Sequence, residues 1–301
     1  FIEEFKLGSL GALIAETQKV FGRLGDYQHS SGGFCYWTGY CYQRDPYLTS
    51  YALEASALAA KEGYKIDDPV MGRAAKWLKG YLSNPKTDWA YPYSASEDYA
   101  ARAYAVYALA LNGSPMTAYF DQLYRKRDQI PYIARAYMLK AAKLMNFDPK
   151  ASKELAAEIL NQGRYTPTQL HFEDAEAMPW VHNSAVHTTA VMLDAMLAAE
   201  GGFPGDEKAV KWLTTERKDK GRWRTTVENA SALRAFQGFY RRYETEDAAG
   251  PHFCGGERSG GGRFRSGEHG FRRGEFQRRR NAGKKRFARR LVGGIRAQRA
   301  V

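Results

Sequence analysis

The sequence predicts an all-α fold, an α/α toroid in which inner and outer helices alternate. The stretch YAARAYAVYALAL, at Tyr99–Leu111, is apolar nearly all round, so a helix here must be buried on both sides. The stretches at Asp67–Asn84, Asp148–Gly163 and Gly205–Gly221 are instead apolar on one side only. No stretch of the sequence shows the sustained alternation of a strand. The one-sided helices would surround the apolar ones, and an ordinary helical solenoid is the alternative.

The chain opens with FIEEFKLGSLGALIAETQ, a pattern that predicts an amphipathic helix rather than a signal peptide. Because Phe1 is not an initiator residue, we expect a piece of a longer protein, with the toroid incomplete at its N-terminal side. No apolar stretch is long and pure enough to predict a membrane span.

A loop rich in glycine and aromatic residues comes next, and it leads into an apolar helix. It reads HSSGGFCYWTGYCYQRDPYLTSYALEASALAA, from His29 to Ala60. Glycine allows a sharp turn, and we expect Phe34 and Trp37 to pack where an outer helix connects to an inner one.

Similar units recur along the chain at intervals of about 40 to 50 residues, enough for two helices and their connections. In order they span Lys86–Gly113, Arg127–Asn146, Glu176–Gly202 and Asp219–Tyr243. The loop tryptophans are Trp37, Trp89, Trp180 and Trp223, and the Arg127 unit has Pro131 at its helix start instead. We interpret these rings as packing at the turns, where they could also form a surface for partner contact, rather than as ligand-stacking groups.

The helix expected from Asp67 shows how an outer helix is specified. Asp67 or Asp68 can cap its start, and Pro69 suits a first turn. Its apolar stripe consists of Val70, Ala74, Trp77, Leu78 and Tyr81. The Gly205 stretch repeats this pattern.

The cysteines at positions 35, 41 and 254 do not have the spacing of a metal site. Cys35 and Cys41 could form one local disulfide if the protein is exported, and two ordinary thiols are the alternative.

The basic residues are concentrated at the C-terminal end. From Pro251 onward the chain has 15 of its 45 Lys and Arg residues and three of its 33 Asp and Glu residues, so the first 250 residues contain 30 of each. With few large apolar residues, this segment cannot bury enough surface to offset its ordering entropy. We expect a disordered tail or a translated wrong reading frame. An Arg/Gly-rich arm that binds RNA or anionic surfaces is the alternative, since phenylalanines are interspersed.

The stretch QLHFEDAEAMPWVHNSAVHTTA has the most functional groups, but we predict a solvated loop and a helix cap at Asn183 or Ser184. Its candidates are His171, Glu173, Asp174, Glu176, His182 and His187. A zinc site needs three or four converging ligands, and His182 and His187 are five residues apart, so no metal is expected. Glu97 and Asp98 suit the first turn of a helix. A general acid at Glu97 or Asp98, with Asp174 as its partner, is the alternative. No phosphate- or dinucleotide-binding motif is present, so no cofactor is expected.

Gln28 with HSSGGFCYW, followed by YLTSYALEASA at Tyr47–Ala57, resembles the thioester-containing domain of alpha-2-macroglobulin and complement proteins, above all the bacterial branch. There a Q-x-x-x-G-G-F-x-Y-W turn leads into a helix with W/Y-L-T-A/S-Y. The stretch DDPVMGRAAKWLKGYL is similar to the outer helix that follows. The resemblance covers Ile14–Tyr243.

The resemblance implies an α/α toroid within a long secreted or envelope-anchored protein that traps proteases. Bait cleavage rearranges such proteins, and many then attach to the target through a thioester in a C-x-E-Q motif. Cys35, Cys41 and Cys254 each lack a glutamine three residues on, and the family's motif would precede Phe1. The loop Thr87–Ala101 also lacks the activating histidine of some members. We therefore assign no thioester and no catalytic residue to this chain.

We expect two parts, a toroid at 1–245 and the tail at 246–301. The predicted function is a protease-inhibitor module, non-catalytic by itself, in an extracellular or periplasmic protein of the cell envelope. Its partners would be other domains of the same long protein and target proteases, with no specific nucleic acid. The alternative function is a secreted helical-toroid enzyme, such as a polysaccharide lyase, a glycosidase or an isoprenoid cyclase.

Overall fold

The computed structural model describes residues 9–42, 44–84, 93–218 and 221–244. The chain separates into two compact units, Phe1–Ala235 and Phe236–Val301. The described part of the second unit, Phe236–Glu244, continues a helix, and the rings of Phe239 and Tyr243 lie 4.7 Å apart within it. The predicted boundary after Thr245 lies at the end of the described residues and stays a prediction.

Within its described residues, the first unit is helical apart from one short hairpin, and its helices alternate as the sequence predicts. The inner helices are α2 (Pro46–Lys61), α4 (Ala95–Leu111), α6 (Tyr132–Leu144), α8 (Ala185–Glu200) and the part of α10 (Thr226–Glu244) up to Ala235. The outer helices are α3 (Asp68–Ser83), α5 (Thr117–Tyr124), α7 (Pro149–Asn161) and α9 (Asp206–Thr215). Helix α1 (Leu10–Gly22) and the 3-10 turn η1 (Leu24–Tyr27) precede them.

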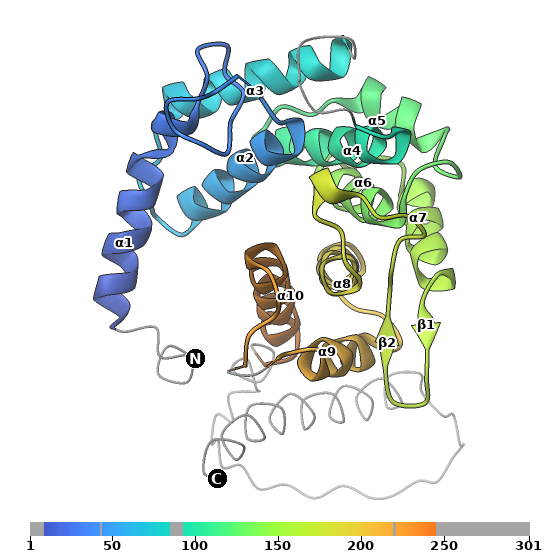
Figure 1. Ribbon diagram of the computed structural model, residues 1–301. Coiled ribbons are helices and arrows are strands. Elements are labelled where there is room, and N and C mark those ends of the chain that lie inside the picture. The colour runs from blue at the N-terminus through green and yellow to red at the C-terminus, as the bar shows by residue number, and fades with distance from the viewer. Residues whose placement is uncertain (1–8, 43, 85–92, 219–220, 245–301) are drawn as a thin grey trace, which may run out of the picture. The chain divides into compact units, whose positions relative to one another are not determined.

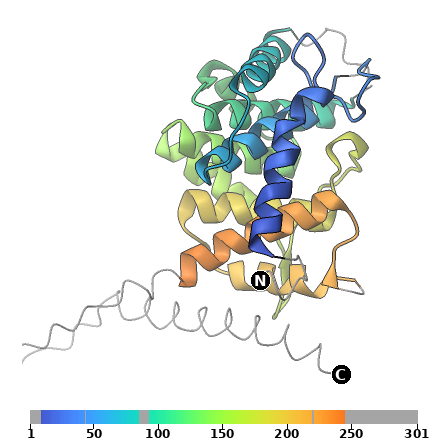
Figure 2. The same ribbon diagram turned by 90° about the vertical axis from the view of Figure 1, so that its left-hand side faces the viewer.

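Each inner helix contacts the next along the chain, from α2 to α4, α6 and α8, and each also packs on the outer helix that follows it. Figure 1 shows this alternation, with the outer helices on the far side of the inner ones from the middle of the unit, and Figure 2 shows the same helices from the side. This is the arrangement of an α/α toroid. No helix in the described part of the chain has both the length and the apolar character needed to cross a bilayer.

Helix α4 shows why these helices lie inside. Ala100, Ala101, Ala103, Ala105 and Ala108 are completely buried on it, which lets neighbouring helices approach closely. Helix α3 buries only one stripe, containing Val70, Ala74, Leu78 and Tyr81, as predicted for an outer helix.

Acidic and hydroxyl side chains cap the helix starts. Asp67 accepts a hydrogen bond from the Val70 amide, and Ser94 and Glu97 form a reciprocal capping box at α4. Ser184 caps α8, as expected. Because a helix N-terminus carries partial positive charge, these acids stabilise the helices they begin.

Helix α5 and the strands β1 (Arg164–Tyr165) and β2 (Leu170–His171) were not predicted. Helix α5 is short and buries only Phe120 and Leu123, so its sequence does not show the repeated spacing of apolar residues that predicts a helix. The strands β1 and β2 form a two-residue antiparallel ladder, too short for an alternating pattern.

Candidate functional site: a cavity between the inner helices

The Gly-Gly-Phe turn is fastened to both α2 and α3. Gly32 has φ +109°, and a side chain there would clash with the Arg73 carbonyl oxygen. The Gln28 amide donates to the Gly32 and Val70 carbonyls, at 2.9 and 2.8 Å. The Phe34 amide donates to the Thr49 hydroxyl of α2 at 2.9 Å. The same kind of hydrogen bond, from a phenylalanine amide to a threonine of the next inner helix, recurs before α8, where the Phe172 amide donates to the Thr189 hydroxyl at 2.9 Å.

The aromatic residues predicted to pack at the turns have different outcomes. Phe34 and Trp223 are buried, at 2% and 4% exposure, and the Trp223 indole donates to the Leu213 carbonyl at 2.9 Å. Trp180 is half-buried, and Trp89 lies outside the described residues. The prediction for Trp37 is wrong, because its side chain is 76% exposed.

Trp37 is exposed because the chain leaves the core after Cys35. A disulfide joins Cys35 to Cys41, with 5.4 Å between their Cα atoms, so the residues between them form a short closed loop. Cys35 is buried, whereas Tyr40 and Tyr42 are exposed together with Trp37.

The acids considered as catalysts are bonded to helix starts. Glu97 accepts hydrogen bonds from the amides of Ser94 and Trp180. Asp174 accepts from the Ile133 amide of α6 and from the Thr188 hydroxyl of α8, at 3.2 and 2.9 Å. Because both carboxylates serve to connect and cap helices, these contacts do not favour the alternative of a helical-toroid enzyme.

Of the three histidines in this stretch, His171 lies apart from His182 and His187, which line the same cavity. His171 stacks on Trp212 of α9, with 4.7 Å between ring centroids. His182 contacts the Tyr36 hydroxyl at 3.0 Å, and His187 lies buried on α8. Across the described ranges, no three His, Cys, Asp or Glu side chains are grouped as metal ligands would be.

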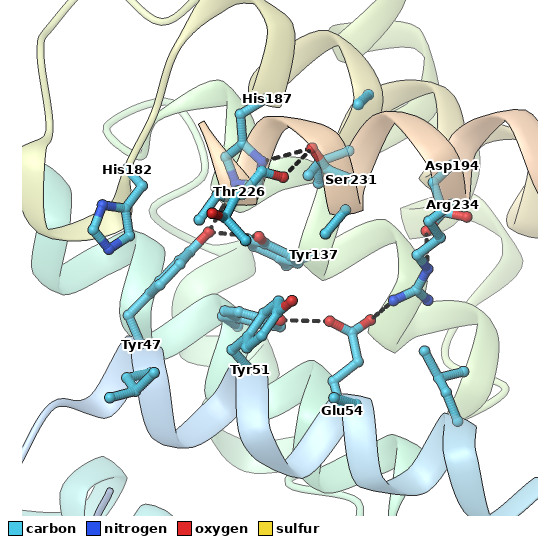
Figure 3. A pocket seen from close by; sticks show the side chains of 18 of the residues that line it. Tyr47, Tyr51, Glu54, Tyr137, His182, His187, Asp194, Thr226, Ser231 and Arg234 are labelled. Carbon is cyan, nitrogen blue, oxygen red and sulfur yellow. Dashed lines mark hydrogen bonds and ion pairs between the residues drawn. The ribbon is translucent and has the colours of Figure 1, made fainter. Parts of the chain in front are cut away.

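The structure instead reveals a cavity of about 270 Å³ in the middle of the first unit. Side chains of α2, α4, α6, α8 and α10 line it, and Figure 3 shows Glu54, Asp194 and Arg234 at one end and His187 and Ser231 at the other. Tyr36 and His182, from two loops, also line it.

At one end, four charged side chains from four helices pair with one another. Lys140 of α6 lies 3.3 Å from Glu54 of α2 and 2.7 Å from Asp194 of α8. Arg234 of α10 pairs with Glu54 and lies 3.0 Å from Asp194. The Tyr104 hydroxyl donates to Glu54 at 2.5 Å. The two acids and two bases compensate one another, and we call these four residues the ion cluster.

The ion cluster stays charged although it is buried. Burial favours the neutral carboxyl of Glu54, but the facing charges of Lys140 and Arg234 outweigh it and lower the pKa of Glu54 to about 2. Burial likewise opposes the charge on Lys140, but Asp194 and Glu54 outweigh it and raise the pKa of Lys140 above its usual value.

At the other end, a chain of hydrogen bonds fixes the ring of His187. The Tyr137 and Tyr47 hydroxyls lie 2.7 Å apart, and the Tyr47 hydroxyl lies 3.1 Å from Nε2 of His187. Nδ1 lies 3.1 Å from the Ser231 oxygen, whose hydroxyl donates to the Val227 carbonyl. Because the Ser231 proton is used in that bond, the Ser231 oxygen can only accept from the imidazole. Nδ1 therefore carries the ring proton and donates to Ser231, and Nε2 accepts from the Tyr47 hydroxyl. Burial lowers the pKa of His187 to about 4.

From the sequence, His187 was a candidate only for metal binding, and the ion cluster was not predicted. A signal was present, because Glu54, Lys140, Asp194 and Arg234 each interrupt the apolar sequence of an inner helix. Their charges alternate in sign along the chain and sum to zero. Charged residues are almost never fully buried unless paired, so this pattern indicates mutual pairing.

Comparison with known proteins gives one consistent result. No protein-family profile matches the chain. It is 22% identical over 150 residues to the alpha-2-macroglobulin of Rickettsia conorii, which covers 48% of this chain and 8% of that protein. The chain therefore spans a small part of the length of this relative.

Solved structures of bacterial alpha-2-macroglobulins have the same fold. The Salmonella protein reacted with methylamine matches 72% of this chain and 14% of its own, with 22% identity and a TM-score of 0.59. The native Escherichia coli protein, from domain MG7 to its C-terminus, matches 78% of this chain and 36% of its own, with 20% identity and a TM-score of 0.63. The E. coli protein activated by porcine elastase matches 76% and 20%, with 21% identity and a TM-score of 0.62.

Proposed function

We propose that this chain is the helical module of a longer protease-trapping protein of the alpha-2-macroglobulin type. The observation that supports this most is the shared fold with E. coli alpha-2-macroglobulin activated by trypsin and by porcine elastase. The partners would be other domains of the same long protein and the target proteases.

The module would do no chemistry of its own. The ion cluster supports this, because its acids and bases already pair with each other. The capping roles of Glu97 and Asp174 support it as well. No thioester is assigned to Cys35 or Cys41, which are joined to each other.

An extracellular or periplasmic location at the cell envelope forms part of the proposal. Disulfides persist in oxidising compartments and are rare in the cytosol, so the Cys35–Cys41 bond supports an exported protein. The balanced charge of residues 1–250 fits a module without specific nucleic-acid binding.

Trapping is tested with the longer protein that contains this chain. After incubation with trypsin, we expect trypsin to cleave a small peptide substrate while a large protein inhibitor no longer reaches it. Deleting residues 9–244 from the longer protein should abolish this protection, and the chain alone should leave trypsin fully accessible. Direct inhibition of trypsin by the chain alone would contradict the proposal.

The absence of chemistry is tested by mass spectrometry of the chain with and without methylamine. We expect no added amine on any glutamine and no newly titratable thiol. An adduct coupled to one new thiol would show a thioester within this chain and overturn its non-catalytic role.

A further inference from the structure

We propose that the central cavity is a binding site for a small uncharged aromatic molecule of about two fused rings that carries one hydroxyl or amide group. The size follows from the volume of about 270 Å³. An apolar cavity of about 150 Å³ in another protein accommodates one benzene ring, so this one has room for roughly two.

The walls of the cavity are largely apolar. The aliphatic residues of α2 that line it are Leu48, Ala55 and Leu58, which are spaced by about one or two helical turns. Val191 of α8 and Val227 of α10 line it from other sides. These side chains face a common space rather than one another, so an apolar occupant would remove their surfaces from water.

Tyrosine rings make the cavity suited to a planar occupant. Tyr104 and Tyr137 stack with 4.2 Å between centroids, and the edge of Tyr47 meets Tyr104 at 4.8 Å. Tyr51 also lines the cavity, and its side chain is 42% exposed (Figure 3). Aromatic rings prefer offset or edge-to-face contacts, and a planar occupant could make such contacts with the tyrosine rings that line the cavity.

Two hydroxyl groups favour one polar substituent on the ligand. Within the described residues, the side-chain hydroxyls of Tyr51 and Thr226 line the cavity and have no hydrogen-bond partner. The hydroxyls of Tyr47, Tyr104 and Ser231 are already used by other groups. A ligand hydroxyl or amide would therefore bond to Tyr51 or Thr226.

The ion cluster selects an uncharged ligand. Glu54 and Asp194 each have two cationic partners, so an anion would find neither Lys140 nor Arg234 uncompensated. A charged ligand would lose its hydration without gaining a new ion pair, which is unfavourable in an apolar space.

The test is isothermal titration calorimetry of the 301-residue chain with two probes of the same shape, 2-naphthol and 2-naphthoate. We expect 2-naphthol to bind at one site. We expect 2-naphthoate to bind more weakly by about tenfold or more, because its carboxylate is charged and must lose its hydration, whereas 2-naphthol carries no charge. Binding of neither probe, or tighter binding of 2-naphthoate, would overturn the proposal; with neither probe bound, a segment of the longer protein becomes the expected occupant.

Matched variants on α2 locate the site. Ala55→Phe fills the cavity from its wall and should remove 2-naphthol binding. Ala60→Phe places the same ring on the exposed side of α2 and should leave it unchanged. Circular dichroism first checks that each variant folds, and Ala230→Leu on α10 replaces Ala55→Phe if that variant does not. Undiminished affinity in the folded cavity variant would place the probe elsewhere and refute the proposed site.

Discussion

The substitution His187→Gln tests whether the cavity end near α8 is buried and neutral. His187 is 5% exposed, and its ring accepts from Tyr47 and donates to Ser231. A glutamine can keep both hydrogen bonds, since its carbonyl accepts and its amide donates. The variant therefore removes the titratable group while retaining the polar contacts.

The size and sign of the effect follow from the pKa of His187. Burial first, and then the neighbouring His182, lower this pKa from 6.5 to about 4, while Glu54 acts in the opposite direction. Between these values the unfolded chain binds the proton and the folded chain does not. Lowering the pH through this window therefore favours unfolding. The free energy of unfolding falls by about 1.36 kcal/mol for each pH unit, so the total loss reaches about 3 kcal/mol by pH 4.

The measurement is urea denaturation at several values between pH 7 and pH 4, followed by tryptophan fluorescence. The free energy of unfolding of the parent should fall by about 3 kcal/mol more than that of His187→Gln over this range. The control His29→Gln, at the Gly-Gly turn, should retain the parent's slope. Parallel slopes for the parent and His187→Gln would show that the imidazole is accessible to protons in the folded state, and the assigned burial would be refuted.

Three further predictions concern the ion cluster, the inner helices and the domain boundary. Glu54→Gln leaves Lys140 and Arg234 with Asp194 alone and should cost about 3 to 5 kcal/mol in urea denaturation at pH 7, whereas Glu158→Gln, nearer solvent, should cost much less. Ala103→Leu overpacks the buried face of α4 and should cost about 1 to 3 kcal/mol, while Ala60→Leu should not change the thermal melting temperature. A chain that ends at Thr245 should keep the cooperative thermal transition of the full chain, and loss of that transition would show that residues beyond 245 complete the toroid.

The sequence by itself indicated most of the helical segments and which of them lie inside, but not the short helix α5. Helix α4 lacks a polar face and helix α3 has one, and burial follows this difference residue by residue. The sequence also located the caps at Asp67 and Ser184 to within one residue, because a cap acts within one turn of the chain. The Gly32 turn belongs with them, since its backbone conformation is one that glycine favours.

Only the tertiary structure decided the cavity and its polar groups. Glu54 and Arg234 are 180 residues apart in sequence, and their pairing depends on how four helices are placed around one space. The exposure of Trp37 was also undecided, because it depends on the direction in which a loop leaves the core. Helix periodicity and caps are set by neighbours within a few residues, whereas a cavity is the space left between distant segments, so its position follows only from their packing.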